Sequence, residues 1–228
     1  MEQKLDYRWY VDYHNRGDAA VEEKMIASLC RYFRLSRWDA FRLAYYYATT
    51  YHIPSALKLL RNPSTPKSEL KFRTDRRYVR INGNYEKVMA ALHPRMLSDL
   101  DKATTTTEQY NIVSSWYFFG RYASFLFLEV WAHINEKPVT DDLVMRWEEK
   151  ENYTKGAELI TGSTDRNVLT QFLESAKVDT NDNCFALETS LCAVEKIRKG
   201  TRWDGFYTER LLDEVRGNEW EGLILSLL

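Results

Sequence analysis

The chain has 228 residues, and its 32 basic and 33 acidic residues leave a net charge of -1. A nearly neutral chain lacks an overall positive field, so any nucleic-acid binding must come from a local patch. The length suits one domain with a substantial core, which we expect to span residues 1–228.

The three cysteines, Cys30, Cys184 and Cys192, exclude a disulfide framework and a structural zinc site, because they are odd in number and lack CxxC or CxxH spacing. We therefore expect a cytoplasmic protein without a metal or cofactor. The N-terminus is too polar for a signal peptide, and the longest apolar run, residues 122–131, is too short to cross a membrane. The sequence thus predicts no membrane association.

Helical periodicity predicts an all-α fold, since apolar residues recur at spacings of three and four and only 9 Gly and 5 Pro interrupt the chain. In chain order, we expect helices at 36–52, 55–61, 84–92 and 94–102, one helical turn beginning at Thr65, and a long aromatic-rich helix at 108–134. Further helices are expected at 141–147, 166–176, 183–199, 204–216 and 219–228. With no repeat and no domain boundary, we expect one globular multi-helix domain around the long central helix.

Arg121 lies inside the expected long helix, in the stretch WYFFGRYASFLFLEVW. Aromatic side chains flank it at helical spacing, so its guanidinium needs an anionic or carbonyl partner. One interpretation is a structural ion pair, for example with Glu129. The other is a ligand for a phosphate or carboxylate, whose two oxygens match the guanidinium fork. Gly120 beside it favours close approach of a backbone or a substrate.

A second candidate cluster is the tyrosine-rich stretch that begins at Arg42. Arg42, Tyr45 and Tyr46 share one side of the expected helix and form a hydroxyl-rich stripe suited to a planar polar ligand. Tyrosines that pack with their hydroxyls at the surface are an equally good interpretation. His52, at the end of the stretch, is a candidate proton carrier, although a lone histidine is more often structural.

A third candidate is the basic segment between Lys58 and Arg95, where ten Lys and Arg face three acidic residues, a local charge of +7. Its loop-rich part, about residues 61–82, places cations among aromatic and polar residues. This composition favours contact with a nucleic-acid backbone or polyphosphate over a merely solvated face. The cations concerned are Lys71, Arg73, Arg76, Arg77 and Arg80.

The fourth candidate is the turn around Gly200, which joins a helix end rich in cations to a new helix. The turn directs Arg202, Tyr207 and the first amides of the next helix toward one point, which suits an anion. The alternative is that the cations only stabilise the helix C-terminus. No P-loop, Rossmann, nucleophile-elbow, HExxH or zinc-deaminase motif occurs, which excludes most common enzyme classes.

Four stretches resemble the phage amino acid:DNA transferases, a family allied to the α-glutamyl/putrescinyl thymine pyrophosphorylases. They are RLAYYYATTYHIPSAL, DRRYVRINGNYEKVM, WYFFGRYASFLFLEVW and SLCAVEKIRKGTRWDGFYTER, in this order between about Met25 and Arg216. The resemblance implies a bacteriophage enzyme that hypermodifies thymine in the host cytoplasm. It also implies a helical fold distantly related to DNA glycosylases, although a clear glycine-rich helix-hairpin-helix turn is missing.

The activity implied by the resemblance is displacement of phosphate or pyrophosphate from activated 5-hydroxymethyluracil in DNA by an amino acid or amine such as glycine, glutamate or putrescine. A hydroxymethyluracil DNA kinase would supply the activated DNA. Such chemistry needs an extruded base, a cationic pocket for the leaving group, an amine site and a proton acceptor.

These requirements can be assigned to residues as a hypothesis. The DNA backbone contacts the five cations of the basic segment. The leaving phosphate and the amino-acid carboxylate are assigned to Arg42, Arg121 and Arg202. The extruded uracil is assigned to Tyr45, Tyr46, Trp116 and Tyr207.

For the proton acceptor we favour Glu129, then Glu188, with His52 in reserve. Covalent assistance by Cys192 is disfavoured, because a cysteine on an apolar helix is usually inert. Two other functions stay open, a noncatalytic DNA-binding protein and a helical scaffold of a DNA-modification complex. Convergence of Arg42, Arg121 and Arg202 on one open pocket would favour the enzyme.

Overall fold

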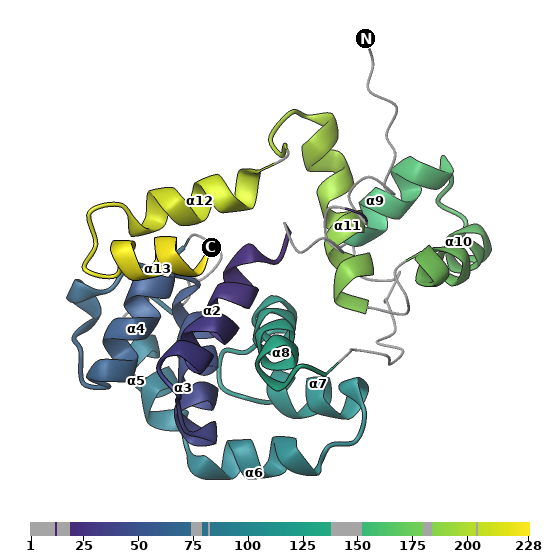
Figure 1. Ribbon diagram of the computed structural model, residues 1–228. Coiled ribbons are helices and arrows are strands. Elements are labelled where there is room, and N and C mark those ends of the chain that lie inside the picture. Colours follow the sequence, from purple (N-terminus) through teal and green to yellow (C-terminus); the bar gives the residue numbers. More distant parts are fainter. Residues whose placement is uncertain are drawn as a thin grey trace. The chain divides into compact units, whose positions relative to one another are not determined.

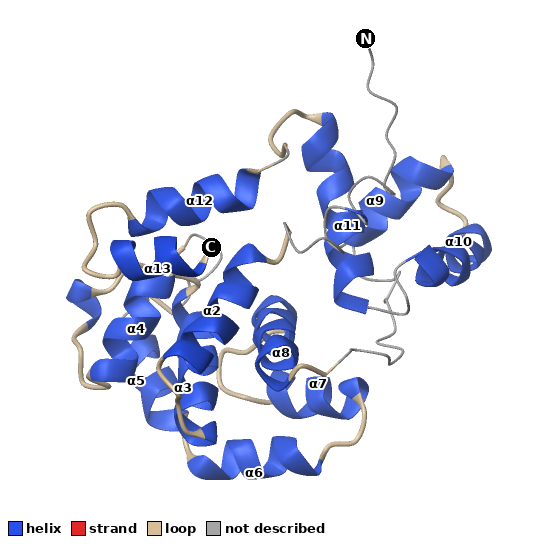
Figure 2. Ribbon diagram, in the orientation of Figure 1, coloured by secondary structure: helices blue, strands red, loops and turns tan. Residues whose placement is uncertain are grey.

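The computed structural model describes residues 12, 19–73, 79–81, 83–137, 152–179, 184–203 and 205–228. These residues form twelve α-helices and one short 3-10 helix, and none of them lies in a β-strand (Figure 2). The prediction of an all-α fold is confirmed. None of the described helices is long and apolar enough to cross a membrane.

The chain divides into two compact units, each described by itself. Unit 1 consists of Met1–Val21 and Pro138–Glu209, and unit 2 of Glu22–Lys137 and Arg210–Leu228. The organisation of residues 1–228 as a single domain stays a prediction. The helices, labelled in Figure 1, are α2 (Val21–Tyr32), α3 (Arg37–Thr50), α4 (Ile53–Arg61), α5 (Asn84–Ala91), α6 (Pro94–Lys102), α7 (Thr106–Ser114), α8 (Arg121–Asn135), α9 (Asn152–Thr161), α10 (Arg166–Asp179), α11 (Cys184–Arg198), α12 (Phe206–Val215) and α13 (Glu221–Leu227), with the 3-10 helix at Lys67–Glu69.

Helix α3 forms the centre of unit 2. It begins where Ser36 caps the backbone N–H of Asp39, and it packs against α4, α6 and α8. Its consecutive tyrosines, Tyr45, Tyr46 and Tyr47, are all buried although they point to different sides of the helix. A helix with aromatic residues on several sides is stable only when other elements surround it, and here the neighbouring helices do so.

Helix α9 packs against α10 and α11 in unit 1. The packing is close at Gly156, because a Cβ atom at this position would lie 1.9 Å from the backbone oxygen of Leu191. Tyr153 and Ala157 are fully buried in the apolar cluster at this contact. The absence of a side chain on Gly156 therefore allows α9 to approach the backbone of α11.

The prediction of one long helix at 108–134 is wrong. Helix α7 ends at Ser114, a turn follows, and α8 begins at Arg121. In the turn Phe118 has a left-handed φ of +61°, and the turn brings Trp116 and Phe119 into contact at 5.3 Å. Burial of these rings outweighs the helical periodicity of the segment, since tertiary packing overrides local propensity.

The other predicted helices agree with the structure to within a few residues, and the 94–102 helix agrees in both bounds. The single turn after Thr65 is the 3-10 helix at Lys67–Glu69. Helices α2 and α9 were not predicted, and the helix predicted at 141–147 lies outside the described residues.

Candidate functional site

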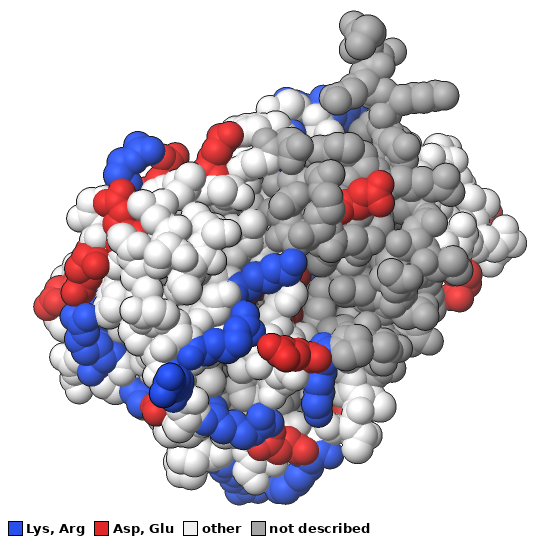
Figure 3. Space-filling view, viewed as in Figure 1, with Lys and Arg blue, Asp and Glu red and all other residues white. Residues whose placement is uncertain are grey.

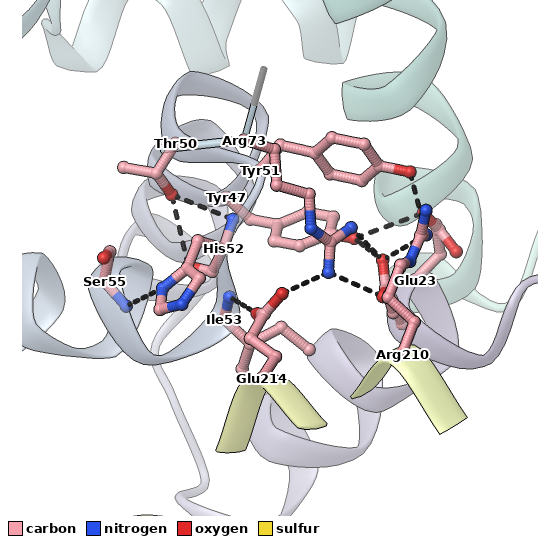
Figure 4. Close-up of polar contacts among 11 residues, drawn as sticks. Glu23, Tyr47, Thr50, Tyr51, His52, Ile53, Ser55, Arg73, Arg210 and Glu214 are labelled. Carbon is pink, nitrogen blue, oxygen red and sulfur yellow. Dashed lines mark hydrogen bonds and ion pairs between the residues drawn. The ribbon is translucent and has the colours of Figure 1, made fainter. Parts of the chain in front are cut away.

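A buried arginine–glutamate network lies in unit 2, centred on Glu22 of α2. Arg73 donates to both oxygens of Glu22, at 2.6 and 2.7 Å, and Arg210 of α12 donates to the same two oxygens at 2.9 and 3.0 Å. Figure 4 labels the two arginines of this network. The side chain of Glu22 is 1% exposed, while those of Arg73 and Arg210 are 14% and 24% exposed. One buried carboxylate thus holds two arginines from distant segments.

Glu214, one helical turn beyond Arg210, completes the network. Its Oε2 accepts a hydrogen bond from Arg73, and its Oε1 accepts from the backbone N–H of Ile53 at 2.6 Å. The two arginines are therefore matched by two carboxylates, as buried ionised groups require.

Tyr51 places its ring between the network and the end of α3. The guanidinium carbon of Arg73 lies 4.2 Å from the centre of this ring, and Arg210 donates to the Tyr51 hydroxyl at 3.1 Å. Tyr51 has a left-handed φ of +51°, a conformation that costs a residue with a side chain about 1–2 kcal/mol. The surrounding contacts must offset this strain, and strained residues of this kind cluster at functional sites.

Electrostatics keep Glu22 ionised. Burial disfavours its charged form, but the charges and hydrogen bonds of Arg73 and Arg210 outweigh burial and hold the pKa of Glu22 below its ordinary value. The pKa of Arg73 is raised by Glu22 despite burial. Both arginines are charged at every physiological pH.

Glu23 behaves in the opposite way. Burial, together with the negative charges of Glu129 and Glu22, raises the pKa of Glu23 to about 8, so this carboxyl holds a proton at neutral pH. The Tyr47 hydroxyl lies 2.9 Å from Glu22 Oε2 and 3.3 Å from Glu23 Oε1. A protonated Glu23 can donate to the Tyr47 oxygen while the Tyr47 hydroxyl donates to Glu22, so Tyr47 bridges a neutral and an ionised carboxyl group.

His52 lies near Arg73 of the network and lines a pocket. Its Nδ1 accepts the backbone N–H of Ser55 at 3.1 Å, which caps α4. Burial and the nearby cations Arg73 and Lys71 lower the pKa of His52 to about 4, so the ring is neutral near pH 7. Because Nδ1 is used as an acceptor, the ring proton is on Nε2 and His52 offers a donor there rather than a base.

A pocket of about 140 Å³ opens next to His52 and Glu214 in unit 2. Lys58, Lys71 and Arg216 line it, with Glu69 as a further acidic residue. A single water needs about 10–15 Å³, whereas sites for drug-sized ligands measure roughly 300–1,000 Å³. The pocket therefore suits a small ionic group and is too small for a whole nucleotide.

The predicted residues of α3 have internal roles. Arg42 forms an ion pair with Asp39 at 2.8 Å and donates to the Tyr46 hydroxyl at 3.4 Å. The Tyr45 hydroxyl donates to the backbone oxygen of Val88 at 2.8 Å. Tyr45 and Tyr46 are buried in the core rather than at an open cleft.

Arg121 is the first residue of α8 and is not in a helix interior. Its guanidinium carbon lies 4.5 Å from the centre of the Phe125 ring, and Gly120 is the N-cap residue with no atom within 4 Å of an added Cβ. The close approach of a backbone expected at Gly120 is therefore not found among the described residues, and the approach of a substrate stays a prediction. Neither Arg42 nor Arg121 lines a pocket described here, so the structure gives no support to the convergence with Arg202 that would favour an enzyme. Glu129 contributes through its charge near Glu23.

The basic segment divides between the interior and the surface. Arg73 belongs to the buried network, whereas Lys71 and Arg80 are exposed. Arg76 and Arg77 lie outside the described residues. On the face drawn in Figure 3, acidic side chains lie among the basic ones. The structure thus gives Arg73 internal partners that the sequence pattern did not predict.

The remaining candidates belong to unit 1. Glu188 of α11 accepts a hydrogen bond from the Cys192 thiol at 3.4 Å. Arg202 lies over Phe206, with its guanidinium carbon 3.9 Å from the ring centre, and donates to the Thr201 oxygen at 2.8 Å. Tyr207 packs beside the buried pair Ala19 and Ala193.

Sequence reasoning missed Glu22, Glu23, Arg210 and Glu214. A usable signal was the position of Glu22, four residues before Ile26 and seven before Leu29, which puts a carboxylate in the apolar stripe of a helix. A charge in such a stripe needs a buried partner.

The described residues contain no group of three or more His, Cys, Asp or Glu side chains placed to hold a metal ion. Comparisons of the chain with protein-family models, curated proteins and solved structures found no match. The resemblance to the amino acid:DNA transferases and the relation to DNA glycosylases therefore stay predictions.

Proposed function

We propose that the chain is a DNA-modifying transferase that attaches an amino acid or amine to the 5-methylene carbon of phosphorylated or pyrophosphorylated 5-hydroxymethyluracil. One observation carries the proposal. Segments that underlie the resemblance meet at one site in unit 2: the first supplies Tyr47, Tyr51 and His52, the third supplies Glu129, and the fourth ends with Arg210. Of these residues, His52 also lines the pocket in which we place the reaction.

The pocket beside His52 matches the ionic part of an amino acid. Within the described residues, the charged ends of Lys58, Lys71 and Glu69 form no ion pair with one another or with other residues. Two lysines can bind a carboxylate or the leaving phosphate, while Glu69 can bind the ammonium group. Cations and an acid around a small volume favour a zwitterion over a simple anion.

Glu214 is the proton acceptor in this proposal. It lines the pocket, and burial raises its pKa although Arg73 opposes the shift, which makes it a stronger base than an exposed glutamate. Glu129 lines neither described pocket, Glu188 belongs to unit 1, and His52 has used its free lone pair on the Ser55 N–H.

The reaction then needs no further reagent. The ammonium group gives one proton to Glu214, and the neutral nitrogen attacks the 5-methylene carbon. The carbon–oxygen bond breaks and the phosphate or pyrophosphate leaves with the electron pair, beside Lys58, Lys71 and Arg216. The buried network holds Glu214 in place through Arg73 and the Ile53 N–H. The exposed cation Arg80 is available for the DNA strand.

The test is incubation of the chain with kinase-treated hydroxymethyluracil DNA and a panel of amines, followed by mass spectrometry of the nucleosides. We expect a new amine-bearing nucleoside. Lys71→Ala should lower its yield at least about tenfold, the usual effect of losing one strong ionic hydrogen bond. Lys102→Ala is the matched control, because this exposed lysine of unit 2 pairs with Asp99 away from the pocket, and it should not change the yield.

Two results would contradict the proposal. If no amine gives a new nucleoside while the chain still binds the DNA, it is a noncatalytic DNA-binding protein. If it neither reacts with nor binds the DNA, a scaffold role is the better explanation.

A further inference from the structure

A second pocket in unit 2 has no role in the transfer reaction proposed above. Its volume is about 470 Å³, within the range of roughly 300–1,000 Å³ that small-molecule sites occupy. Three of its lining residues are apolar, Met96, Ile112 and Trp116, and four are polar, His93, Arg95, Asp99 and Ser115. An apolar wall with a few polar groups beside it is typical of a site for an organic ring that carries a polar substituent.

Trp116 gives this pocket a fixed aromatic wall. Its ring lies 5.0 Å from Phe127, 5.3 Å from Phe119 and 5.7 Å from Phe41, all in edge-to-face geometry. These contacts hold the indole in position before any ligand arrives. A planar ring that enters the pocket therefore meets a surface that needs no reorganisation, which favours binding.

Arg95 supplies a cation that can move to a ligand at little cost. Its side chain is 82% exposed and lies 3.5 Å from Asp99, a weak surface pair. Asp99 is also bound by Lys102 at 3.1 Å, so it keeps a counter-ion when Arg95 turns away. His93 accepts the Arg95 N–H on Nδ1 at 3.1 Å, which places the proton of a neutral His93 on Nε2 as a further donor.

We propose that this pocket binds a nucleotide, with the base against Trp116 and Met96 and the phosphate at Arg95. The choice of a nucleotide follows from the two groups that this pocket offers, because the exposed guanidinium of Arg95 can bind a phosphate and the fixed indole of Trp116 can stack on a base. The nucleotide can be free or part of a single strand, and binding requires no transfer chemistry.

The experiment is calorimetric titration of the full chain with thymidine 5′-monophosphate, without amine or activated DNA. Thymidine and ribose 5-phosphate each lack one half of the ligand, and both should bind at least about tenfold more weakly. Arg95→Ala should weaken the nucleotide about tenfold while leaving thymidine unchanged. Arg31→Ala, which removes an exposed arginine of unit 2 that pairs with Glu136 and lines neither pocket, should leave both unchanged.

Met96→Trp fills the pocket from its half-buried edge and should abolish binding without disturbing the aromatic core, which circular dichroism can verify. A short oligothymidylate separates the two sources: tighter binding than the monophosphate, with the same dependence on Arg95, identifies a strand, and weaker binding identifies the free nucleotide. The proposal is overturned if the monophosphate does not bind, or if Lys71→Ala abolishes its binding while Arg95→Ala and Met96→Trp have no effect. Failure of the transfer assay would leave this result untouched.

Discussion

The two units of this chain differ in the chemistry of their buried interiors. In unit 1, α9 approaches α11 through Gly156, and the surrounding cluster is apolar. In unit 2, the interior holds Glu22 with two arginines beside a wall of tyrosines. The contact between α9 and α11 depends on close apolar packing, whereas the network around Glu22 depends on the ionised state of its side chains. Perturbation of charge should therefore affect unit 2, and perturbation of volume should affect unit 1.

The largest expected effect comes from Glu22→Gln. Removal of one partner from a buried ionic network costs about 3–5 kcal/mol, because the remaining charges keep their desolvation penalty. We expect a loss of this size in urea denaturation, with hydrogen exchange accelerated in α3 and unchanged in α9. Glu136→Gln removes the exposed pair with Arg31 and should cost less than about 1 kcal/mol. Equal losses in the two variants would contradict a network that stabilises unit 2.

The next effect is steric and belongs to unit 1. Gly156→Ala places a Cβ against the Leu191 oxygen, and such overpacking costs about 1–3 kcal/mol or more. Hydrogen exchange should accelerate in α9 and α11. The same change at Gly222 in α13, where no atom lies within 4 Å, should instead stabilise by about 0.5–1 kcal/mol. Unchanged stability in Gly156→Ala would contradict the close approach of α9 to the backbone of α11.

The smallest effect is a dependence on pH that only unit 2 should show. The pKa of Glu23 rises from 4.5 to about 8 on folding, so the folded state binds the extra proton and stability falls as pH increases through this range. His52, whose pKa falls from 6.5 to about 4, acts in the opposite direction below pH 6.5. Between pH 6.5 and 8 the Glu23 effect should dominate, with a slope of at most about 1.4 kcal/mol per pH unit.

Glu23→Gln should flatten the pH profile between 6.5 and 8, measured as the free energy of unfolding at each pH. His52→Asn retains an N-cap residue for α4 and should flatten only the profile below pH 6.5. An unchanged slope in Glu23→Gln would show that another group titrates in this window.

The helices were largely predictable, because caps and prolines at Ser36, Pro54 and Pro94 are local signals. The turn before Arg121 was not, since it is stabilised by rings that meet only in the folded state. The network was also beyond local reasoning. Arg73 and Arg210 look like other cations in the sequence, and only their approach to Glu22 distinguishes them. His52 and Lys71 were identified from composition, and they are the two predicted residues that line the smaller pocket.

The pairing of Glu22 with Arg210 joins positions separated by 188 residues. During synthesis, Glu22 and Arg73 leave the ribosome long before Arg210 and Glu214 do. Until Arg210 has been synthesised, the Glu22 carboxylate can pair only with Arg73. Water must then hydrate the oxygen lone pairs that Arg210 will later occupy. The network around Glu22 is therefore completed only after α12 has been synthesised, and only then can this part of the interior lose its water.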